Sequence, residues 1–195
     1  LVESAARLCD ARHAMIFQRE GDVFKLAANH GYTDEYRKWM QGQVVGQGRG
    51  TLVGRTVLDR RMVHIPDATM DPEYTWSESL KRSGNRTMLG VPLLREGIPI
   101  GVIALARSNV SSFTVRQIEL VTTFADQAVI AIENVRLFDQ VQARTRDLAE
   151  SLEQQTATSE VLQVISSSPG ELEPVFQKML ENATRVCGAK FGTMY

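Results

Sequence analysis

The chain has 195 residues, of which 43% are hydrophobic, with 22 basic side chains against 23 acidic ones. This length fits one ordinary domain and roughly 50 further residues, and the apolar fraction excludes wholesale disorder. The net charge of −1 argues against nucleic-acid binding by bulk electrostatics. No apolar run approaches the roughly 18 residues that span a membrane. We therefore expect neither nucleic acid nor membrane as a partner.

The first residues and the two cysteines indicate the cellular compartment to expect for the chain. The chain begins without a methionine, in the middle of an amphipathic pattern, so we expect a fragment without a signal peptide. Its two cysteines, Cys9 and Cys187, are too few for a disulfide scaffold and lack metal-binding spacing. Buried thiols in a reduced, cytoplasmic setting are the simplest interpretation.

The same two cysteines mark a sequence repeat. Residues 179–195 align without gaps with residues 1–17 and match them at five positions. The repeat predicts a tandem array, in which the chain holds most of one domain and the opening of the next. That opening segment cannot bury its apolar face alone, so we expect it to be disordered or to dock on another copy of the chain.

Strands and helices alternate in the part of the chain before Thr114. Apolar runs bounded by turn residues predict strands, and Gly97 marks a hairpin between the two strongest ones. In chain order we expect strands at 14–17 and 24–29, a helix at 35–42, a helix after the glycine-rich loop 46–51, a strand at 61–65, a short helical stretch between 71 and 85, and strands at 87–94 and 99–106.

A long helix is predicted from Thr114 to Ser168, where the apolar residues follow a helical period. Part of it carries a coiled-coil-like seam of apolar residues. The seam has two interpretations: a helix packed on its own domain, or the contact of a parallel homodimer, which we favour. The seam residues are Val121, Phe124, Ala128, Ala131, Val135 and Phe138.

The sequence shows no set of residues typical of catalysis. The glycine-rich loop lacks the Gly-Lys-Ser/Thr end of a phosphate-binding P-loop. His13, His30 and His64 lie on separate predicted elements without a second metal ligand nearby. The long helix contains no histidine that could accept a phosphoryl group. We therefore expect no catalytic residue, no metal site and no enzyme activity in this chain.

The two strongest strands and the start of the long helix carry a family resemblance. Together with sequence upstream they resemble a GAF domain, over about residues 1–136, and residues 171–195 resemble the start of a second one. The matching segments are TMLGVPLL (87–94), GIPIGVIAL (97–105), SFT (112–114), ADQAVIAIEN (125–134), and the shorter stretches 54–57, 64–68 and 71–72.

The resemblance implies an α+β fold, with a central antiparallel sheet of about six strands, flanking helices and a ligand-sized pocket on one face. It divides the chain into a GAF-like domain at 1–136 with a truncated first helix, a coiled-coil-like helical linker at 137–169, and the incomplete start of a second GAF-like domain at 170–195. Tandem GAF domains of this kind imply a bacterial signalling protein, such as the sensor histidine kinase of a two-component system or a nucleotide cyclase.

The resemblance leaves the cofactor unknown. Cyclic-nucleotide-binding relatives carry an Asn-Lys, Phe, Asp-Glu signature, of which Phe113 is present while Gln117 and Ile118 stand in the Asp-Glu place. Bilin-binding members and methionine sulfoxide reductases of the family use pocket cysteines, and residues 30–110 contain none. A haem would need an axial histidine, for which His64 is the nearest candidate.

The implied pocket is roofed by the segment between Ala68 and Arg86. Aromatic walls with a few cations suit a small planar or anionic ligand. The alternative is that Tyr74 and Trp76 are core residues of the lid. The candidate pocket residues are Arg49, His64, Tyr74, Trp76, Arg82, Arg86, Met88 and Leu105.

Two functions are open at this point. The first, which we favour, is a non-catalytic sensory or regulatory module that binds a small molecule and transmits through its C-terminal helix to downstream domains. A ligand acts in this way only if it binds two states of the helix with different affinity. The second is a ligand-free dimerisation scaffold that spaces catalytic domains.

Overall fold

The computed structural model of the chain describes residues 2–167 and 173–186. The contacts divide the chain into two compact units, Leu1–Asn134 and Val135–Tyr195. The first unit contains the sheet and the helices around it. The second contains the last part of the long helix and one further helix.

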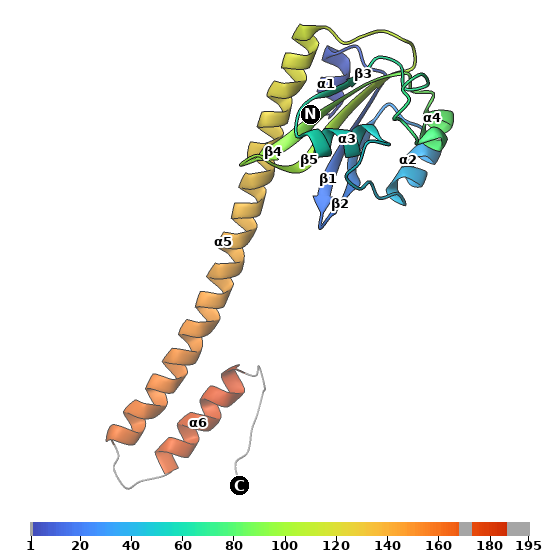
Figure 1. Cartoon of the computed structure of the whole chain (residues 1–195). Coiled ribbons are helices and arrows are strands. Elements are labelled where there is room, and N and C mark those ends of the chain that lie inside the picture. The colour runs from blue at the N-terminus through green and yellow to red at the C-terminus, as the bar shows by residue number, and fades with distance from the viewer. Residues whose placement is uncertain (1, 168–172, 187–195) are drawn as a thin grey trace. The chain divides into compact units, whose positions relative to one another are not determined.

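The first unit is built on an antiparallel sheet of five strands in the order β2-β1-β5-β4-β3 (Figure 1). The strands are β1 (His13–Glu20), β2 (Val23–His30), β3 (Val63–Ile65), β4 (Thr87–Arg95) and β5 (Ile98–Arg107). Each neighbouring pair runs antiparallel. The predicted α+β fold with a central antiparallel sheet and a long C-terminal helix is confirmed.

Outside the five strands, one further backbone pairing lies at the edge of the sheet beside β2. Phe24 and Val45 form a single antiparallel bridge, with backbone hydrogen bonds of 2.8 and 3.0 Å. The glycine-rich loop begins directly after Val45 and turns the chain toward the next helix. Within the described residues, the sheet therefore has five strands and this single bridge beside β2, near the six strands that the resemblance implies.

The hairpin between β4 and β5 turns at Glu96 and Gly97, whose φ angles are +51° and +77°. Two successive residues with positive φ match the right-handed twist of the flanking strands. The predicted hairpin is confirmed. It places β5 in the middle of the sheet, between β1 and β4.

Three short helices cover one face of the sheet (Figure 1). They are α2 (Asp34–Gln41), α3 (Leu52–Asp59) and α4 (Ser77–Ser83). Thr33 and Thr51 are the N-caps of α2 and α3, because each hydroxyl oxygen accepts a hydrogen bond from a backbone N–H of the first turn. The glycine-rich loop thus serves to position the capped start of α3.

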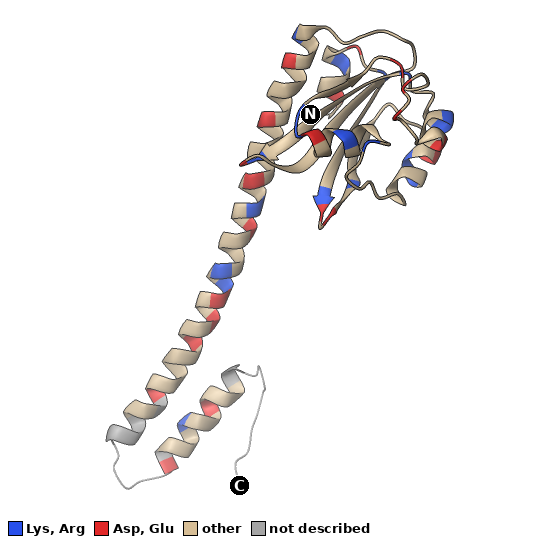
Figure 2. Ribbon diagram, in the orientation of Figure 1, with Lys and Arg blue, Asp and Glu red and all other residues tan. Residues whose placement is uncertain are grey.

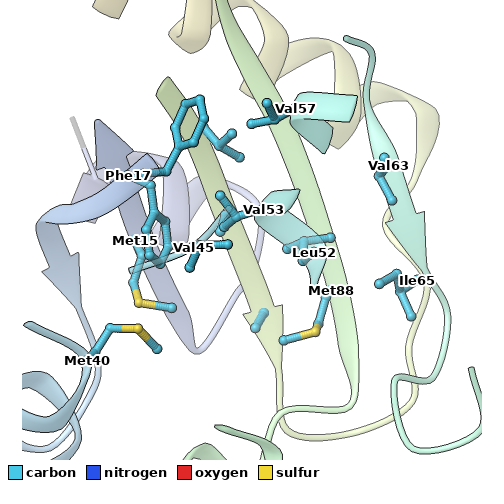
Figure 3. Close-up of a cluster of buried hydrophobic side chains, with 14 of the residues drawn as sticks. Met15, Phe17, Met40, Val45, Leu52, Val53, Val57, Val63, Ile65 and Met88 are labelled. Atoms are coloured by element: carbon cyan, nitrogen blue, oxygen red, sulfur yellow. The ribbon is translucent and has the colours of Figure 1, made fainter. Parts of the chain in front are cut away.

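A core cluster lies between this face and the three helices, and we call it the cavity-side core (Figure 3). The approach of α3 to β4 is close, since a Cβ added at Gly90 would collide with Thr56 and Leu52. The cluster consists of Met15, Phe17, Phe24, Tyr36, Met40, Val45, Leu52, Val53, Val57, Val63, Ile65, Ala68, Met88, Val102, Ala104 and Ala106.

The opposite face of the sheet packs against α1 (Val2–Leu8) and the first turns of α5 (Val115–Ser167) (Figure 1). We call this cluster the helix-side core. It consists of Ala5, Ala6, Cys9, Ala14, Leu89, Val91, Leu93, Ile103, Leu105, Phe113, Val121, Ala125 and Ala128.

The central strand β5 contributes to both cores, because successive side chains of a strand point to opposite faces of the sheet. Val102, Ala104 and Ala106 belong to the cavity-side core. Ile103 and Leu105 belong to the helix-side core. One layer of backbone therefore separates the two.

In the second unit, α6 (Glu173–Val186) contacts the last part of α5. The side-chain amide of Asn182 donates a hydrogen bond of 3.1 Å to the carbonyl oxygen of Ala157. Lys178 forms an ion pair of 3.1 Å with Glu160. Residues 173–186 are thus helical and contact their own chain.

The rest of the predicted start of a second domain, at 170–172 and 187–195, lies outside the described residues. Docking of this segment on a second copy of the chain stays a prediction. So does the division of residues 137–195 into a helical linker and the start of a second domain.

Candidate functional site

A small cavity lies between the sheet and the three short helices. Its volume is about 20 Å³, close to the space that one water molecule needs. Most of its wall is apolar or aromatic. The lining residues are Met15, Phe17, Tyr32, Tyr36, Met40, Thr51, Leu52, Val53, Tyr74, Trp76, Ser79, Met88, Ala104, Leu105 and Ala106.

Aromatic rings form a continuous row beside the cavity. His13 stacks on Tyr32 with ring centroids 4.2 Å apart, and Tyr32 stacks on Tyr36 at 4.5 Å. Trp39 and Trp76 continue the row with tilted rings, at centroid distances of 5.5 and 5.8 Å. Contacts of this geometry stabilise aromatic pairs beyond the burial of their area. The row links β1 and α2 to the start of α4.

Neutral polar groups connect the same rings. The hydroxyls of Tyr36 and Ser79 lie 2.9 Å apart. The side-chain amide of Asn85 donates to the Tyr32 hydroxyl at 2.9 Å, and its carbonyl oxygen lies 2.8 Å from Nδ1 of His13. Burial raises the pKa of both tyrosine hydroxyls and lowers the pKa of His13. All members of the network are therefore uncharged at neutral pH.

Tyr74, Trp76, Met88 and Leu105, from the predicted pocket set, border this cavity. Tyr74 and Trp76 come from the segment that the resemblance places over the pocket. Burial raises the pKa of the Tyr74 hydroxyl. Leu105 belongs to the helix-side core, so it marks the place where the two cores adjoin.

The other four predicted pocket residues do not border the cavity, and three of them are arginines with acidic partners. Arg86 forms an ion pair of 2.5 Å with Asp67 and holds the pKa of that carboxyl well below its usual value. Arg82 forms an ion pair of 2.6 Å with Glu78, and its guanidinium lies 5.2 Å from the ring centroid of Trp39. The remaining two are Arg49 and His64.

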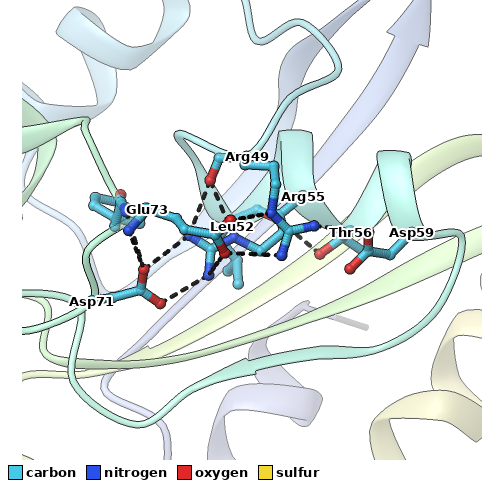
Figure 4. Close-up of polar contacts among 8 residues, drawn as sticks. Arg49, Leu52, Arg55, Thr56, Asp59, Asp71 and Glu73 are labelled. Carbon is cyan, nitrogen blue, oxygen red and sulfur yellow. Dashed lines mark hydrogen bonds and ion pairs between the residues drawn. The ribbon is translucent and has the colours of Figure 1, made fainter.

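Arg49 belongs to a network that fixes the loop beside α3 (Figure 4). It pairs with Glu73 and Asp59. Arg55, whose side chain is 7% exposed, donates to both carboxylate oxygens of Asp71 at 2.8 and 3.1 Å, and also to the carbonyl oxygen of Arg49. The contact with Arg55 lowers the pKa of Asp71. The loop is thereby attached to α3 by a nearly buried ion pair.

Arg55 and Asp71 are absent from the predicted pocket set. The available signal was an arginine between apolar residues of a helical pattern, at Leu52–Val57, which needs a buried partner. The sequence names that arginine but not its partner, because the Asp-Pro turn at 71–72 approaches α3 only through the tertiary fold.

Arg107, at the end of β5, contacts Phe113 and Gln117, which stand at two positions of the cyclic-nucleotide signature. Neither of these residues borders the cavity. The guanidinium of Arg107 lies 4.3 Å from the ring centroid of Phe113, and it donates to the carbonyl oxygen of Cys9 at 2.7 Å and to Oε1 of Gln117 at 3.3 Å. The backbone N–H of Phe113 is also 3.5 Å from Nε2 of His64. These contacts join α1, β5 and the start of α5.

The residues of the predicted helix seam separate into two groups. Val121 and Ala128 are buried in the helix-side core, and Phe124 packs against it. For these, the interpretation of a helix packed on its own domain applies. The other three are exposed: Ala131, Val135 and Phe138.

Within residues 2–167 and 173–186, no cluster of His, Cys, Asp and Glu could hold a metal ion. No helix in this part of the chain is long and apolar enough to cross a membrane. Cys9 is buried, and burial raises the pKa of its thiol, which disfavours the reactive thiolate.

The GAF domain family matches residues 1–132. Among solved structures, the GAF domain of a phosphoenolpyruvate-protein phosphotransferase from Coxiella burnetii has a TM-score of 0.62 and 19% identity, covering 72% of this chain and 84% of that chain. Residues 122 to 287 of a methyl-accepting chemotaxis protein have a TM-score of 0.59 and 21% identity, covering 70% and 87%. The type II free methionine-R-sulfoxide reductase of Thermoplasma acidophilum has a TM-score of 0.55 and 19% identity, covering 68% and 89%.

No curated protein matches the chain. At the identities found, the solved structures show the fold alone, and the reductase activity is a property of the Thermoplasma protein. The family match is different in kind, because it covers the whole sheet and the first turns of α5. The chain therefore belongs to the GAF domain family.

Proposed function

We propose that the chain is a sensory or regulatory module of a signal-transduction protein. It binds a small molecule in the cavity, passes the change to α5, and through α5 acts on downstream domains. Membership of the GAF family and the likeness to a chemotaxis protein support a signalling role. The proposal includes a cytoplasmic setting and a chain without enzyme activity of its own.

The observation that carries this proposal is the strand shared by the two cores. Ala104 and Ala106 border the cavity, and their neighbours Ile103 and Leu105 are fully buried under α1 and α5. Close-packed interiors transmit displacement rather than absorb it. A ligand that shifts β5 at the cavity therefore also changes how α5 packs on the opposite face of the sheet.

Native mass spectrometry of the chain as purified tests the binding step, and amide exchange tests the transmission. We expect a retained small molecule, whose removal increases exchange in β5 and in residues 118–132 of α5. A chain that retains no molecule and binds none from a metabolite mixture would contradict the proposal. A ligand that changes the exchange of β5 alone would contradict the route through α5.

The tandem arrangement predicted from the repeat is part of the proposal. In the repeat, Leu8 is equivalent to Val186. Both residues are helical, Leu8 in α1 and Val186 in α6. This agreement supports α6 as the first helix of a second GAF-like domain.

A second candidate function is the dimerisation scaffold, which is favoured by the small cavity and by the exposed apolar residues of α5. Val135, Phe138 and Val141 are each 62% to 63% exposed. Charged residues of both signs recur along the same helix (Figure 2). Of these, Val135 and Phe138 continue the alternating three- and four-residue spacing that begins at Ala128 and Ala131, which is typical of helices that pair with a second copy.

Sedimentation equilibrium with Phe138→Lys tests the scaffold. We expect a homodimer for the unchanged chain and a monomer for the variant, because a lysine in an apolar seam is left without a partner. Gln140→Lys, an exposed position two residues away, is the control and should keep the dimer. A monomeric unchanged chain, or a dimer that survives Phe138→Lys, would remove this candidate.

A further inference from the structure

We propose that the cavity takes an uncharged, planar ring compound with at least one hydrogen-bonding substituent. This statement rests on the proposed function, because it requires the cavity to admit a small molecule. It narrows the expectation from the sequence, which allowed either a planar or an anionic ligand.

The charge of the ligand follows from the cavity wall. None of the described residues that line the cavity is acidic or basic. The arginines predicted to attract an anion have acidic partners: Arg49 contacts Glu73 and Asp59, Arg82 contacts Glu78, and Arg86 contacts Asp67. A charged ligand would therefore lose its hydration without gaining a counter-charge, which is strongly unfavourable.

The planar shape follows from the rings around the cavity. Tyr32 and Tyr36 stack with an interplanar angle of 19°. Trp76 and Tyr74 supply further aromatic faces on the side of the lid. Aromatic faces attract a planar ring in offset or edge-to-face arrangements, while Met15, Met40 and Met88 adapt their flexible side chains to its outline.

The hydrogen-bonding substituent follows from Ser79. Its side chain is buried, its hydroxyl oxygen lies 2.9 Å from that of Tyr36, and Tyr74 lines the same cavity. Burial keeps both tyrosines protonated by raising the pKa of each hydroxyl. These three hydroxyls can donate to or accept from a carbonyl, amide or hydroxyl group of the ligand. A ring without such a group would break the existing hydrogen bonds of these hydroxyls on entering the cavity and would offer no replacement, which is unfavourable.

The lid over the cavity is the part that can yield. A cavity of about 20 Å³ is too small for a ring, so one wall must move. Trp76 occupies the N-cap position of α4 without a side-chain capping hydrogen bond, and α4 has only 7 residues. By contrast, α3 is capped by Thr51 and joined to Asp71 through Arg55. We therefore place the opening at Trp76 and the first turn of α4.

Three nearly isosteric probes test the proposal: benzamide, benzoate and benzamidine, which are neutral, anionic and cationic at neutral pH. Their dissociation constants for the 195-residue chain can be measured by saturation-transfer NMR. We expect benzamide to bind at least about tenfold more tightly than either charged probe, because only it avoids burying an unpaired charge.

Variants locate the binding. Ala104→Leu fills the cavity from β5 and should abolish benzamide binding, whereas Ala27→Leu, on the exposed side of β2, should leave it unchanged. Ser79→Ala should weaken benzamide binding by about fivefold, the value of one neutral hydrogen bond. If circular dichroism shows that Ala104→Leu is unfolded, Ala106→Val takes its place.

The outcomes separate this proposal from the proposed function. Benzamide binding that is selective and sensitive to Ala104→Leu supports both. Benzoate or benzamidine binding that equals benzamide and is lost in Ala104→Leu overturns the ligand class and leaves the sensory function standing. If no probe binds, the ligand class is overturned, and native mass spectrometry of the purified chain then decides the sensory function separately.

Discussion

The two faces of the sheet are filled by different kinds of side chain. The helix-side core is closed by aliphatic residues that are completely buried, among them Leu89, Leu93 and Ile103. The cavity-side core holds methionines, aromatic rings and hydroxyls around a cavity of about 20 Å³. Thioether chains fill irregular gaps and tolerate changes of shape. The helix-side core is thus packed rigidly, whereas the side chains of the cavity-side core can rearrange.

The arginines that anchor the two faces also differ. Arg107 and Arg55 are both buried. The contacts of Arg107 on the helix side go to neutral oxygens, such as the carbonyl oxygens of Cys9 and Asp10. Arg55, on the cavity side, depends on the carboxylate of Asp71. The comparison indicates that the cavity side is the one that a change of charge or of ligand can loosen.

The largest expected effect is on neighbouring residues of β4 that face opposite cores. Leu89→Ala should lower the free energy of unfolding by about 4 kcal/mol, because its fully packed surroundings cannot collapse into the space. Met88→Ala should cost about 2 kcal/mol, because the lid over the cavity can relax toward it. Urea denaturation measures both values. Equal losses for the two variants would mean that the faces do not differ in rigidity.

A smaller effect is expected for the ion pair on the cavity side. Asp71→Asn removes the carboxylate that pairs with nearly buried Arg55 and should cost about 3 kcal/mol in the free energy of unfolding. Asp34→Asn, which affects the exposed ion pair with Arg37, is the matched control and should change stability little. A loss no larger than the control's would show that the loop is held by its other contacts.

The same pair gives this effect a pH dependence. The contact with Arg55 places the pKa of Asp71 below its usual value, which is near 3.9 in unfolded chains. The stabilisation is therefore complete above about pH 4 and is lost as the pH falls through the folded-state pKa. The difference in unfolding free energy between the unchanged chain and Asp71→Asn should shrink over that acidic range.

Local sequence signals predicted the central hairpin of the sheet and the alternation of side chains between its two faces. Gly97 between two apolar runs was sufficient for the central hairpin, because two residues with positive φ are favoured there. The alternation of side chains along 99–106 follows directly from the period of a strand. Residues such as Tyr74, Trp76 and Met88 were placed at the cavity through the family resemblance, which supplied the position of the lid.

What the sequence could not predict depends on long-range geometry. A helical apolar period is the same whether the helix packs on its own sheet or on a partner, so Val121 and Ala128 could not be told from Val135 and Phe138. The positive charge of an arginine likewise does not show whether its side chain belongs to the cavity wall or pairs with an acidic residue outside it. Arg49 and Arg86 were assigned to the pocket because they flank it in sequence, whereas Glu73 and Asp67 hold them outside the cavity wall.

The helix caps provide a third prediction, in which the two faces should agree. Thr51 caps α3 on the cavity side, and Thr114 forms a reciprocal pair of hydrogen bonds with Gln117 at the start of α5. Thr51→Ala and Thr114→Ala should each cost about 1 kcal/mol in thermal or urea unfolding. Amide exchange should then rise at the cavity only for Thr51→Ala. An equal rise of amide exchange at the cavity in Thr114→Ala would contradict the separation of the two faces.

The smallest expected effect is the protonation of His13, which tests whether the polar network of the cavity side stays neutral. Burial lowers the pKa of His13, so between the unfolded value near 6.5 and the lower folded value the unfolded chain binds more protons. The free energy of unfolding should therefore fall as the pH drops below about 6.5, and His13→Gln should reduce this slope. An NMR titration of the His13 ring measures the folded pKa directly. A folded pKa above 6.5 would mean that the His13 ring is protonated more readily than in the unfolded chain despite its burial and the nearby Arg12. An anionic ligand would then have a positively charged partner on this face.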